Sequence, residues 1–426
     1  MKHEYHTSSQ RIFPVICDDG EILVTASLHH ALRMLQVLDL RKVKKIGTKQ
    51  KFFWIDAICI DQENIEERGS QVAIMANIYQ AASTVIIWLG EEDEFTSDAC
   101  TVIDRLSKVS SDRYSVIKPT HWWDQGPTLR KIGTKPIDFR NWLGFLAFMN
   151  RPWFKRAWIV QELILAKLPV IVCGSVVILW ETVSRTIDFL INTGWYNHLH
   201  TEWLKVHHPI ILKTPGPYSR LLQSNTDVGM AALYLQGTRS GIKTHGKLAI
   251  LRYLLEAHRY TESTDPRDKI YAFLGLSRKD RPPFSTHPSA ITPDYTLPVQ
   301  TLYTNVTKIM LQSYGDLRLL PNVEDRSRTK IQGLSSWVPD YSVQLQPHPL
   351  STLGNCKWCA AGHHCWKPDS RELSAQLLNV QGVLVDTICE AVVMTDESDN
   401  LLAFWTTVIA VSSGLDDYYH ITSADM

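Results

Sequence analysis

Polar residues that could bind a ligand gather where an apolar run of the sequence ends. The run covers residues 52–60 (FFWIDAICI) and is interrupted only by Asp56. A short apolar run rich in isoleucine and aromatic residues predicts a strand buried on both faces, as in a parallel sheet. Ligands of open α/β sheets bind beyond the carboxyl ends of the strands. The residues expected at or near this end are Asp56, Cys59, Asp61 and Gln62.

Asp56 and two arginines have side chains suited to binding, but each also has a structural interpretation. A carboxylate inside a buried strand needs partners, so Asp56 either accepts hydrogen bonds from backbone amides or faces a pocket. Arg68 and Arg156 could hold a phosphate through two parallel hydrogen bonds. The alternative, which the sequence favours, is that these arginines form ion pairs with acids such as Asp61 or Glu67.

Three cysteines in the last quarter of the chain raise the question of a zinc site. Cys356 and Cys359 form a CxxC pair, and Cys365 follows two histidines. Structural zinc needs four such ligands. The spacing is tighter than in ordinary zinc fingers and a second CxxC is missing, so we predict no metal there. The sequence also has no Walker A, GxGxxG, GxSxG or HExxH motif, and we expect no resident cofactor.

The elements around the candidate residues predict an α/β fold. Residues 65–82 carry apolar side chains at spacings of three and four, which is typical of an amphipathic helix, and residues 84–89 (TVIIWL) predict a second buried strand. Strand, helix and strand together predict a right-handed βαβ unit. With a hairpin over 11–25 and a further strand over 169–173, we expect a flavodoxin-like parallel sheet flanked by helices.

Patterning and composition divide the chain into three parts. We expect the α/β domain over 11–175, a mainly helical region over 176–330, and a small β-rich α+β region over 331–426. The 44 basic and 44 acidic residues give a formal charge of zero, which argues against a general nucleic-acid or membrane-surface binder. No window approaches about 18 uninterrupted apolar residues, so we expect no transmembrane helix. The scattered cysteines suit a reduced, cytoplasmic protein.

Two blocks of sequence, in this order, resemble a fungal family. The first is WIDAICIDQ…ER…QV…M…IY…A…V…WLG, from Trp54, and the second is RPWF.R.W..QE, from Arg151. Both are similar to the heterokaryon incompatibility (HET) domain. The later strings TDPRDKIYAFLGL, ITPDY, and SSWVPDY with AAG shortly after look like the C-terminal part of HET proteins. The resemblance covers residues 11–365 and implies a role in fungal non-self recognition, where incompatible partners trigger programmed cell death.

The HET family is in turn distantly similar to TIR domains, some of which cleave NAD⁺. A TIR glycohydrolase keeps a catalytic glutamate in a local pattern like W-C-x-x-E-L, and residues 158–163 (WIVQEL) are similar. The resemblance therefore implies that Glu162 is the catalytic carboxylate and that Trp158 belongs to the same site. Cleavage of the nicotinamide–ribose bond passes through an oxocarbenium-like state, which a carboxylate stabilises. The structural alternative is that Glu162 is an ordinary solvated or salt-bridged surface glutamate.

One departure from the family pattern bears on activity. HET domains usually begin with a strand ending in a pattern like A-L-S-Y-x-W-G, and this sequence lacks it. In TIR-like folds that strand is central and helps to line the nucleotide pocket, so its absence favours a non-catalytic signalling or assembly module. The retained WIVQEL favours an NAD⁺ glycohydrolase. A third alternative is a HET-like protein recruited as an enzyme of specialised metabolism. We also expect self-association and an incompatibility partner protein.

Overall fold

The computed structural model describes eight stretches of the chain. These are residues 10–17, 20–38, 52–117, 125–198, 230–245, 250–277, 291–344 and 377–378. All of them belong to one compact unit, residues 1–378. The three cysteines of the zinc question lie outside the described residues, so the absence of a metal there stays a prediction. No helix in the described stretches is long and apolar enough to cross a membrane.

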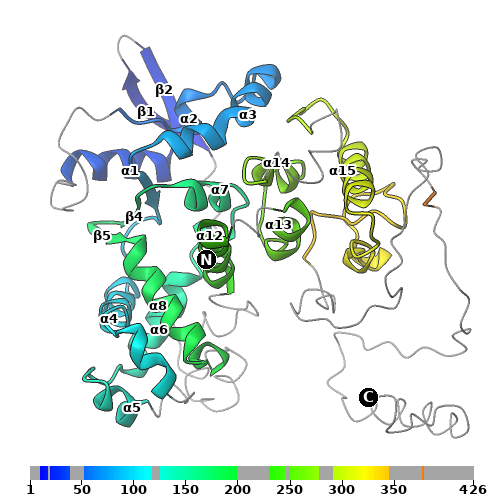
Figure 1. Ribbon diagram of the computed structural model, residues 1–426. Coiled ribbons are helices and arrows are strands. Elements are labelled where there is room, and N and C mark those ends of the chain that lie inside the picture. Colours follow the sequence, from blue (N-terminus) through cyan, green and yellow to red (C-terminus); the bar gives the residue numbers. More distant parts are fainter. Residues whose placement is uncertain are drawn as a thin grey trace, which may run out of the picture. The chain divides into compact units, whose positions relative to one another are not determined.

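An N-terminal hairpin forms where the sequence predicts it, and a helix follows. β1 (Arg11–Cys17) pairs antiparallel with β2 (Gly20–Thr25). α1 (Ala26–Val37) follows directly and packs against the hairpin (Figure 1). Its cap is Thr25, because the Thr25 hydroxyl accepts a hydrogen bond from the Leu28 N–H at 3.3 Å.

The predicted strand over 52–60 is wrong. Its second half instead forms α2 (Asp56–Cys59), a single helical turn. The strand prediction assumed burial on both faces, but the Phe52 side chain is 92% exposed. Asp56 also gives the backbone a local partner, since its Oδ1 accepts a hydrogen bond from the Ala57 N–H at 2.7 Å. The predicted βαβ unit therefore does not form.

The central sheet has three strands in the described residues. β3 (Val85–Trp88) and β4 (Pro169–Cys173) are parallel, whereas β5 (Val176–Leu179) is antiparallel to β4, and the order is β3-β4-β5. The predicted α/β class is confirmed, but this sheet is mixed and not the flavodoxin-like parallel sheet that we expected. Gly174 explains the reversal, because its φ of +53° lets the chain turn back at once into β5.

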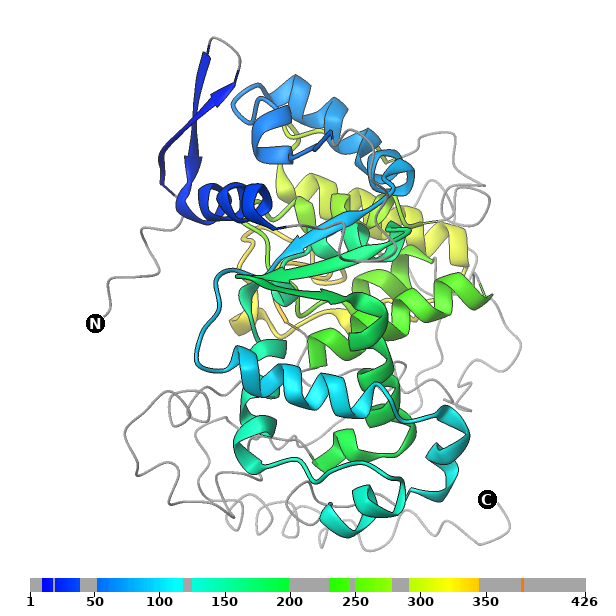
Figure 2. The ribbon, with the colours of Figure 1, turned by 90° about the vertical axis from the view of Figure 1, so that its left-hand side faces the viewer.

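Three long helices lie together beside the sheet. They are α4 (Thr96–Leu106), α6 (Phe139–Met149) and α8 (Trp180–Asn192), and the sheet and α4 can be followed in Figure 2. Gly144 allows the close crossing of α4 and α6, because a Cβ at this position would lie only 2.4 Å from the Asp98 Cβ. Their facing side chains form part of one buried core that continues into the C-terminal helices.

A short helix, α7 (Trp158–Leu165), connects the N-terminal elements with the C-terminal ones. It packs on α3 (Ile65–Ala81), on α12 (Met230–His245) and on α14 (Asp268–Leu274) (Figure 1). With its amide oriented so that both ends find partners, the buried Gln161 accepts from the Ala76 N–H at 2.7 Å and donates to the Ala272 carbonyl oxygen at 3.1 Å. One side chain of α7 thus joins α3 to α14.

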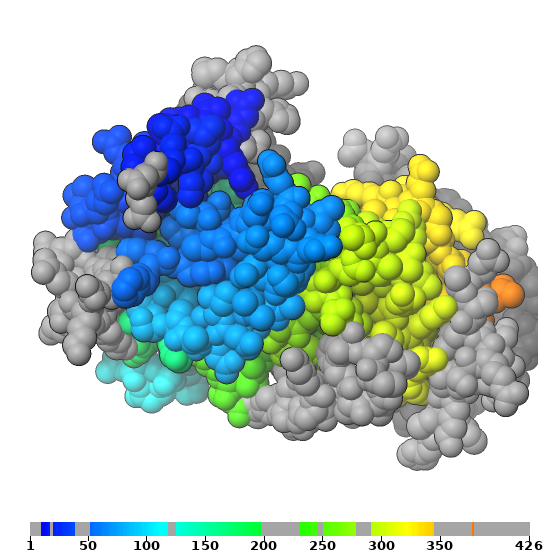
Figure 3. Space-filling model, turned by 90° about the horizontal axis from the view of Figure 1, so that it is seen from above, coloured from blue at the N-terminus to red at the C-terminus, as the bar shows by residue number. Residues whose placement is uncertain are grey.

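The remaining helices complete the C-terminal part and the connections. In Figure 3 the light-blue surface of α3 adjoins the yellow-green surface of this C-terminal part. The remaining α-helices are α5 (Gly126–Lys131), α13 (Leu251–Ala257) and α15 (Val299–Tyr314). The short 3-10 turns are η2 (Ser111–Val116), η3 (Pro152–Lys155), η4 (Trp195–His198), η5 (Leu320–Asn322) and η6 (Arg326–Arg328).

Candidate functional site

Glu162 lies on α7 with two hydrogen-bond donors at its carboxylate. Its helix neighbours Gln161 and Leu163 are buried, whereas Glu162 keeps partial exposure. The Tyr79 hydroxyl, on α3, and the Trp153 indole, on η3, each donate a hydrogen bond to the carboxylate. Glu162 is therefore not a freely solvated glutamate, and its proximity to Arg156 also fits the salt-bridged alternative.

The surroundings of Glu162 shift its protonation toward neutral pH. Burial raises the pKa of Glu162 to about 7, and the nearby Asp56 carboxylate acts in the same direction. The Arg156 guanidinium and the two hydrogen bonds oppose this rise in pKa. Burial, together with the charges of Glu162 and Asp56, holds the pKa of Tyr79 well above its usual value. A carboxyl that titrates near pH 7 is suited to proton transfer or charge stabilisation.

Three residues named from the sequence meet in this cluster. Asp56 at the start of α2 and Arg156 just before α7 both lie close enough to Glu162 to change its pKa. Gln62 lies next to the cluster, because its Nε2 donates to the Asp56 carbonyl oxygen at 3.1 Å. The Trp54 ring meets the Tyr79 ring edge-on, with the ring centroids 5.9 Å apart. We call Asp56, Tyr79, Trp153, Arg156 and Glu162 the carboxylate cluster.

Two other predicted site residues lie at the surface of the turn before α3. The Asp61 Oδ1 accepts a hydrogen bond from the Glu63 N–H at 3.0 Å, and the Asp61 N–H donates to the Glu67 Oε1 at 3.0 Å. Asp61 thereby organises the turn that leads into the helix. Cys59 is exposed on α2. The structure gives neither of them a contact with the carboxylate of Glu162.

Arg68 and Trp158 belong to a neighbouring network with the C-terminal part. The Arg68 Nη2 lies 3.4 Å from the Asp265 Oδ2, and the guanidinium carbon lies 3.6 Å from the centroid of the Tyr295 ring. Arg68 thus forms an ion pair with an acid, as expected, but its partner is Asp265 and not Asp61 or Glu67. The Trp158 indole donates a hydrogen bond to Asp268.

Tyr79 and Trp153 were missed as site residues from the sequence. Tyr79 falls on the apolar face of the helix over 65–82, where an aromatic residue predicts a position in the hydrophobic core. Trp153 stands in the apolar RPWF string. The usable indication was chemical, since buried tyrosine and tryptophan rings carry one polar atom each that needs a partner.

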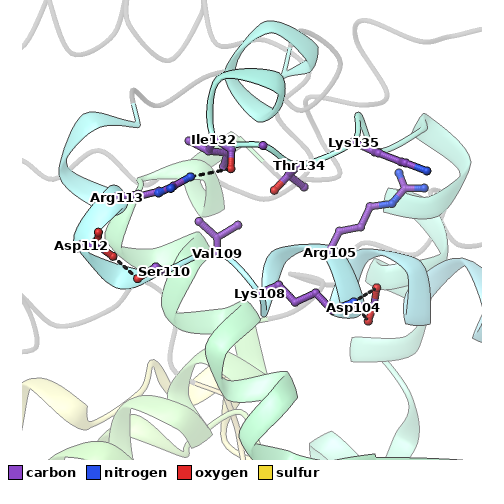
Figure 4. Close-up of a pocket in the computed structure, with 11 residues that line it drawn as sticks. Asp104, Arg105, Lys108, Val109, Ser110, Asp112, Arg113, Ile132, Thr134 and Lys135 are labelled. Carbon is purple, nitrogen blue, oxygen red and sulfur yellow. Dashed lines mark hydrogen bonds and ion pairs between the residues drawn. The ribbon is translucent and has the colours of Figure 1, made fainter.

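A cavity of about 690 Å³ lies at the C-terminal end of α4, and no residue of the carboxylate cluster lines it (Figure 4). Most of its charged side chains already have partners. The Lys108 Nζ lies 2.6 Å from the Asp104 Oδ1, and the Arg113 Nη1 donates to the Ile132 carbonyl oxygen at 3.0 Å. We therefore place the candidate chemistry at the carboxylate cluster and not in this cavity.

The chain resembles known proteins over most of its length. Residues 2–162 match the family model described as heterokaryon incompatibility protein (HET). The chain is also similar to heterokaryon incompatibility protein 6, OR allele, of Neurospora crassa, with 26% identity over 375 residues. This similarity covers 77% of the chain and 50% of the relative, so the chain spans about half the length of the curated relative that it matches. No solved structure matches the chain.

Proposed function

This chain carries a HET domain, and we propose that it acts in fungal non-self recognition and in the cell death that follows an incompatible encounter. The family match over residues 2–162 and the relative named for heterokaryon incompatibility support this role. The same blocks of sequence that match the family hold the residues of the carboxylate cluster. The proposal therefore joins a biological role to a chemical site.

For the chemistry, we propose that Glu162 supports cleavage of NAD⁺ to nicotinamide and ADP-ribose, as the likeness to TIR domains implies. The observation that supports this proposal is the Glu162 carboxyl, which lies beside Tyr79 and Trp153 and has a pKa of about 7. In its ionised form, Glu162 would stabilise positive charge that develops on the ribose. The exposed Arg156 guanidinium would bind the phosphates of the substrate.

The electrons and protons of this reaction balance without a further reactant. The bond between the ribose carbon and the pyridinium nitrogen breaks, and nicotinamide leaves with the bonding pair as a neutral molecule. Water then adds to the ribose cation and gives up one proton. Glu162 accepts that proton and returns it to solvent, which its near-neutral pKa permits.

Assembly without catalysis is the second candidate function, and the hairpin favours it. On the outer face of the hairpin, the side chains of Ile12, Ile16 and Leu23 are 59%, 71% and 48% exposed. Exposed apolar side chains on one face are typical of a protein contact. A two-stranded hairpin also leaves backbone groups unpaired at its edges, where a further strand can add.

Incubation of the pure protein with NAD⁺ and measurement of free nicotinamide test the chemistry directly. Glu162→Gln should lower the rate about 10²–10³-fold, the usual loss for one group that stabilises developing charge. The matched control is Glu94→Gln, at an exposed position, which should keep the rate. Equal turnover by the Glu162 variant, or no turnover by the parent chain, refutes the glycohydrolase proposal. Expression in a fungal host tests cell death separately, and killing without loss of NAD⁺ would favour assembly.

A further inference from the structure

Residues 262–268 (ESTDPRD), which we call the clasp, touch three elements that carry site residues. The clasp leads into α14, ends at its first residue, Asp268, and contains the first part of the TDPRDKIYAFLGL string. The proposed chemistry gives this string no role. Its contacts nevertheless run to the backbone at Arg156, to Trp158 on α7 and to Arg68 on α3.

The first contact fixes the backbone on both sides of Arg156. Glu262 forms a parallel β-bridge with Arg156. The Glu262 N–H donates to the Lys155 carbonyl oxygen at 2.5 Å, and the Ala157 N–H donates to the Glu262 carbonyl oxygen at 2.9 Å. These bonds use only backbone atoms, so they do not depend on the side chain at residue 262. They fix the position of the Arg156 Cα and hence of its side chain.

The second and third contacts hold α7 and α3. Asp268 accepts one hydrogen bond from the Trp158 indole and another, at 2.5 Å, from the Tyr295 hydroxyl. Asp265 pairs with Arg68 at 3.4 Å. Trp158 stands one helical turn before Glu162 on α7, so the bond to Asp268 restrains the same helix that presents the carboxylate.

Two buried basic residues, Lys269 and Arg259, form hydrogen bonds next to the clasp. The Lys269 Nζ donates to the Arg259 carbonyl oxygen at 3.1 Å and to the Thr261 Oγ1 at 3.0 Å. The Arg259 guanidinium, only 4% exposed, donates to the Glu324 carboxylate and, at 2.7 Å, to the Val343 carbonyl oxygen. Partnered charges at this depth resist displacement, because moving one leaves the other buried and unpaired.

We propose that the clasp is the positioning element of the candidate site: the Glu262 bridge holds Arg156 beside Glu162, and the Asp268 bond to Trp158 holds α7. Its effect on turnover rests on the proposed function, but the geometric part does not. The groups that face Glu162 and bear on its titration are Asp56, Tyr79, Trp153 and Arg156, and Arg156 is the one that the bridge controls.

The test compares Glu262→Pro with Glu262→Ala in the full chain. Proline has no N–H, so it removes the bond to Lys155, whereas alanine keeps both backbone bonds and removes only an exposed side chain. The readout is the titration of the Glu162 carboxyl, followed by carbon NMR of labelled glutamate, with Glu162→Gln to assign the signal. Arg156→Gln removes the guanidinium charge, so it gives the largest rise that we expect in the titration midpoint of Glu162.

The proline variant should raise the titration midpoint toward that of Arg156→Gln, by about one unit, which is the lower end for loss of a nearby opposite charge. The alanine variant should keep the midpoint of the parent. If proline and alanine give the parent value while Arg156→Gln raises it, the bridge does not position Arg156 and the proposal is wrong. This readout needs no turnover, so a parent chain that never cleaves NAD⁺ would refute the proposed function alone.

A second pair of variants covers the case in which Glu262→Pro does not fold. Trp158→Phe removes the donor to Asp268, and Trp337→Phe is its matched control, since that buried indole nitrogen has no partner in the described residues. Amide hydrogen exchange in α7 should become at least about tenfold faster in the first variant, a change of about 1.4 kcal/mol in local opening, and unchanged in the second. Equal exchange in both variants contradicts the proposal.

Discussion

Glu162→Gln should make the folded protein more stable above pH 7, although it removes the proposed catalytic group. In the folded protein, burial raises the pKa of this carboxyl from 4.5 to about 7. Between these two pH values the folded state keeps a proton that the unfolded state has released. The free energy of unfolding therefore falls as the pH rises through this window. Glutamine keeps the shape and one acceptor oxygen for Tyr79 or Trp153, and it cannot ionise.

The size of the effect follows from the two pKa values. A gap of about 2.5 units at about 1.4 kcal/mol per unit corresponds to about 3 kcal/mol lost by the parent at pH 8. At pH 5 the carboxyl is nearly neutral in the folded state and only partly ionised in the unfolded state, so the loss is about 1 kcal/mol. The advantage of the glutamine variant should thus grow by about 2 kcal/mol between pH 5 and pH 8.

Urea unfolding of the parent, Glu162→Gln and the exposed control Glu94→Gln at both pH values measures this difference. The control should track the parent within about 0.5 kcal/mol, as surface substitutions usually do. Equal stability of parent and Glu162→Gln at pH 8, or an advantage of the same size at pH 5, would refute the argument from burial. Such a result would mean that the Glu162 carboxyl is solvated in the folded protein.

Three further predictions follow, one for the site and two for glycines in helices. Because the Arg156 charge lowers the pKa of Glu162, Arg156→Gln should move the midpoint of the pH–rate profile for NAD⁺ cleavage above about 7, with the rate rising as the pH rises; an unchanged midpoint would exclude the contact. Gly144→Ala should cost about 1–3 kcal/mol, because its Cβ would meet the Asp98 Cβ at 2.4 Å. The open helical site Gly237→Ala should gain about 0.5–1 kcal/mol in the same urea assay.

The helix and strand patterns of the sequence predict elements well where burial follows the pattern. The helix expected from Ile65 is observed over Ile65–Ala81, and the strand expected over 84–89 is observed over Val85–Trp88. The strand prediction for residues 52–60 fails because apolar composition does not say which apolar residues are buried. Phe52 is exposed. The direct return from β4 into β5 depends on one glycine with positive φ, which periodicity does not reveal.

The candidate site was predictable only in part, and the reason is distance along the chain. Glu162 and Arg156 stand in one block of sequence, and Asp56 stands in the other block that resembles the family. Tyr79 was not predicted as a site residue because its ring suits the apolar face of a helix. The partner of Arg68 lies 197 residues away, and no local pattern links the two.

The family match ends at residue 162, inside α7, while two partners of that helix, Asp268 and Ala272, stand more than a hundred positions later. This matters for any exchange of segments between this chain and a related one. A recombinant joined after residue 162 would set Trp158 and Gln161 from one parent against Asp268 and Ala272 from the other. Such hybrids should fail unless both parents carry compatible residues at these places. The two stretches should therefore covary among related chains.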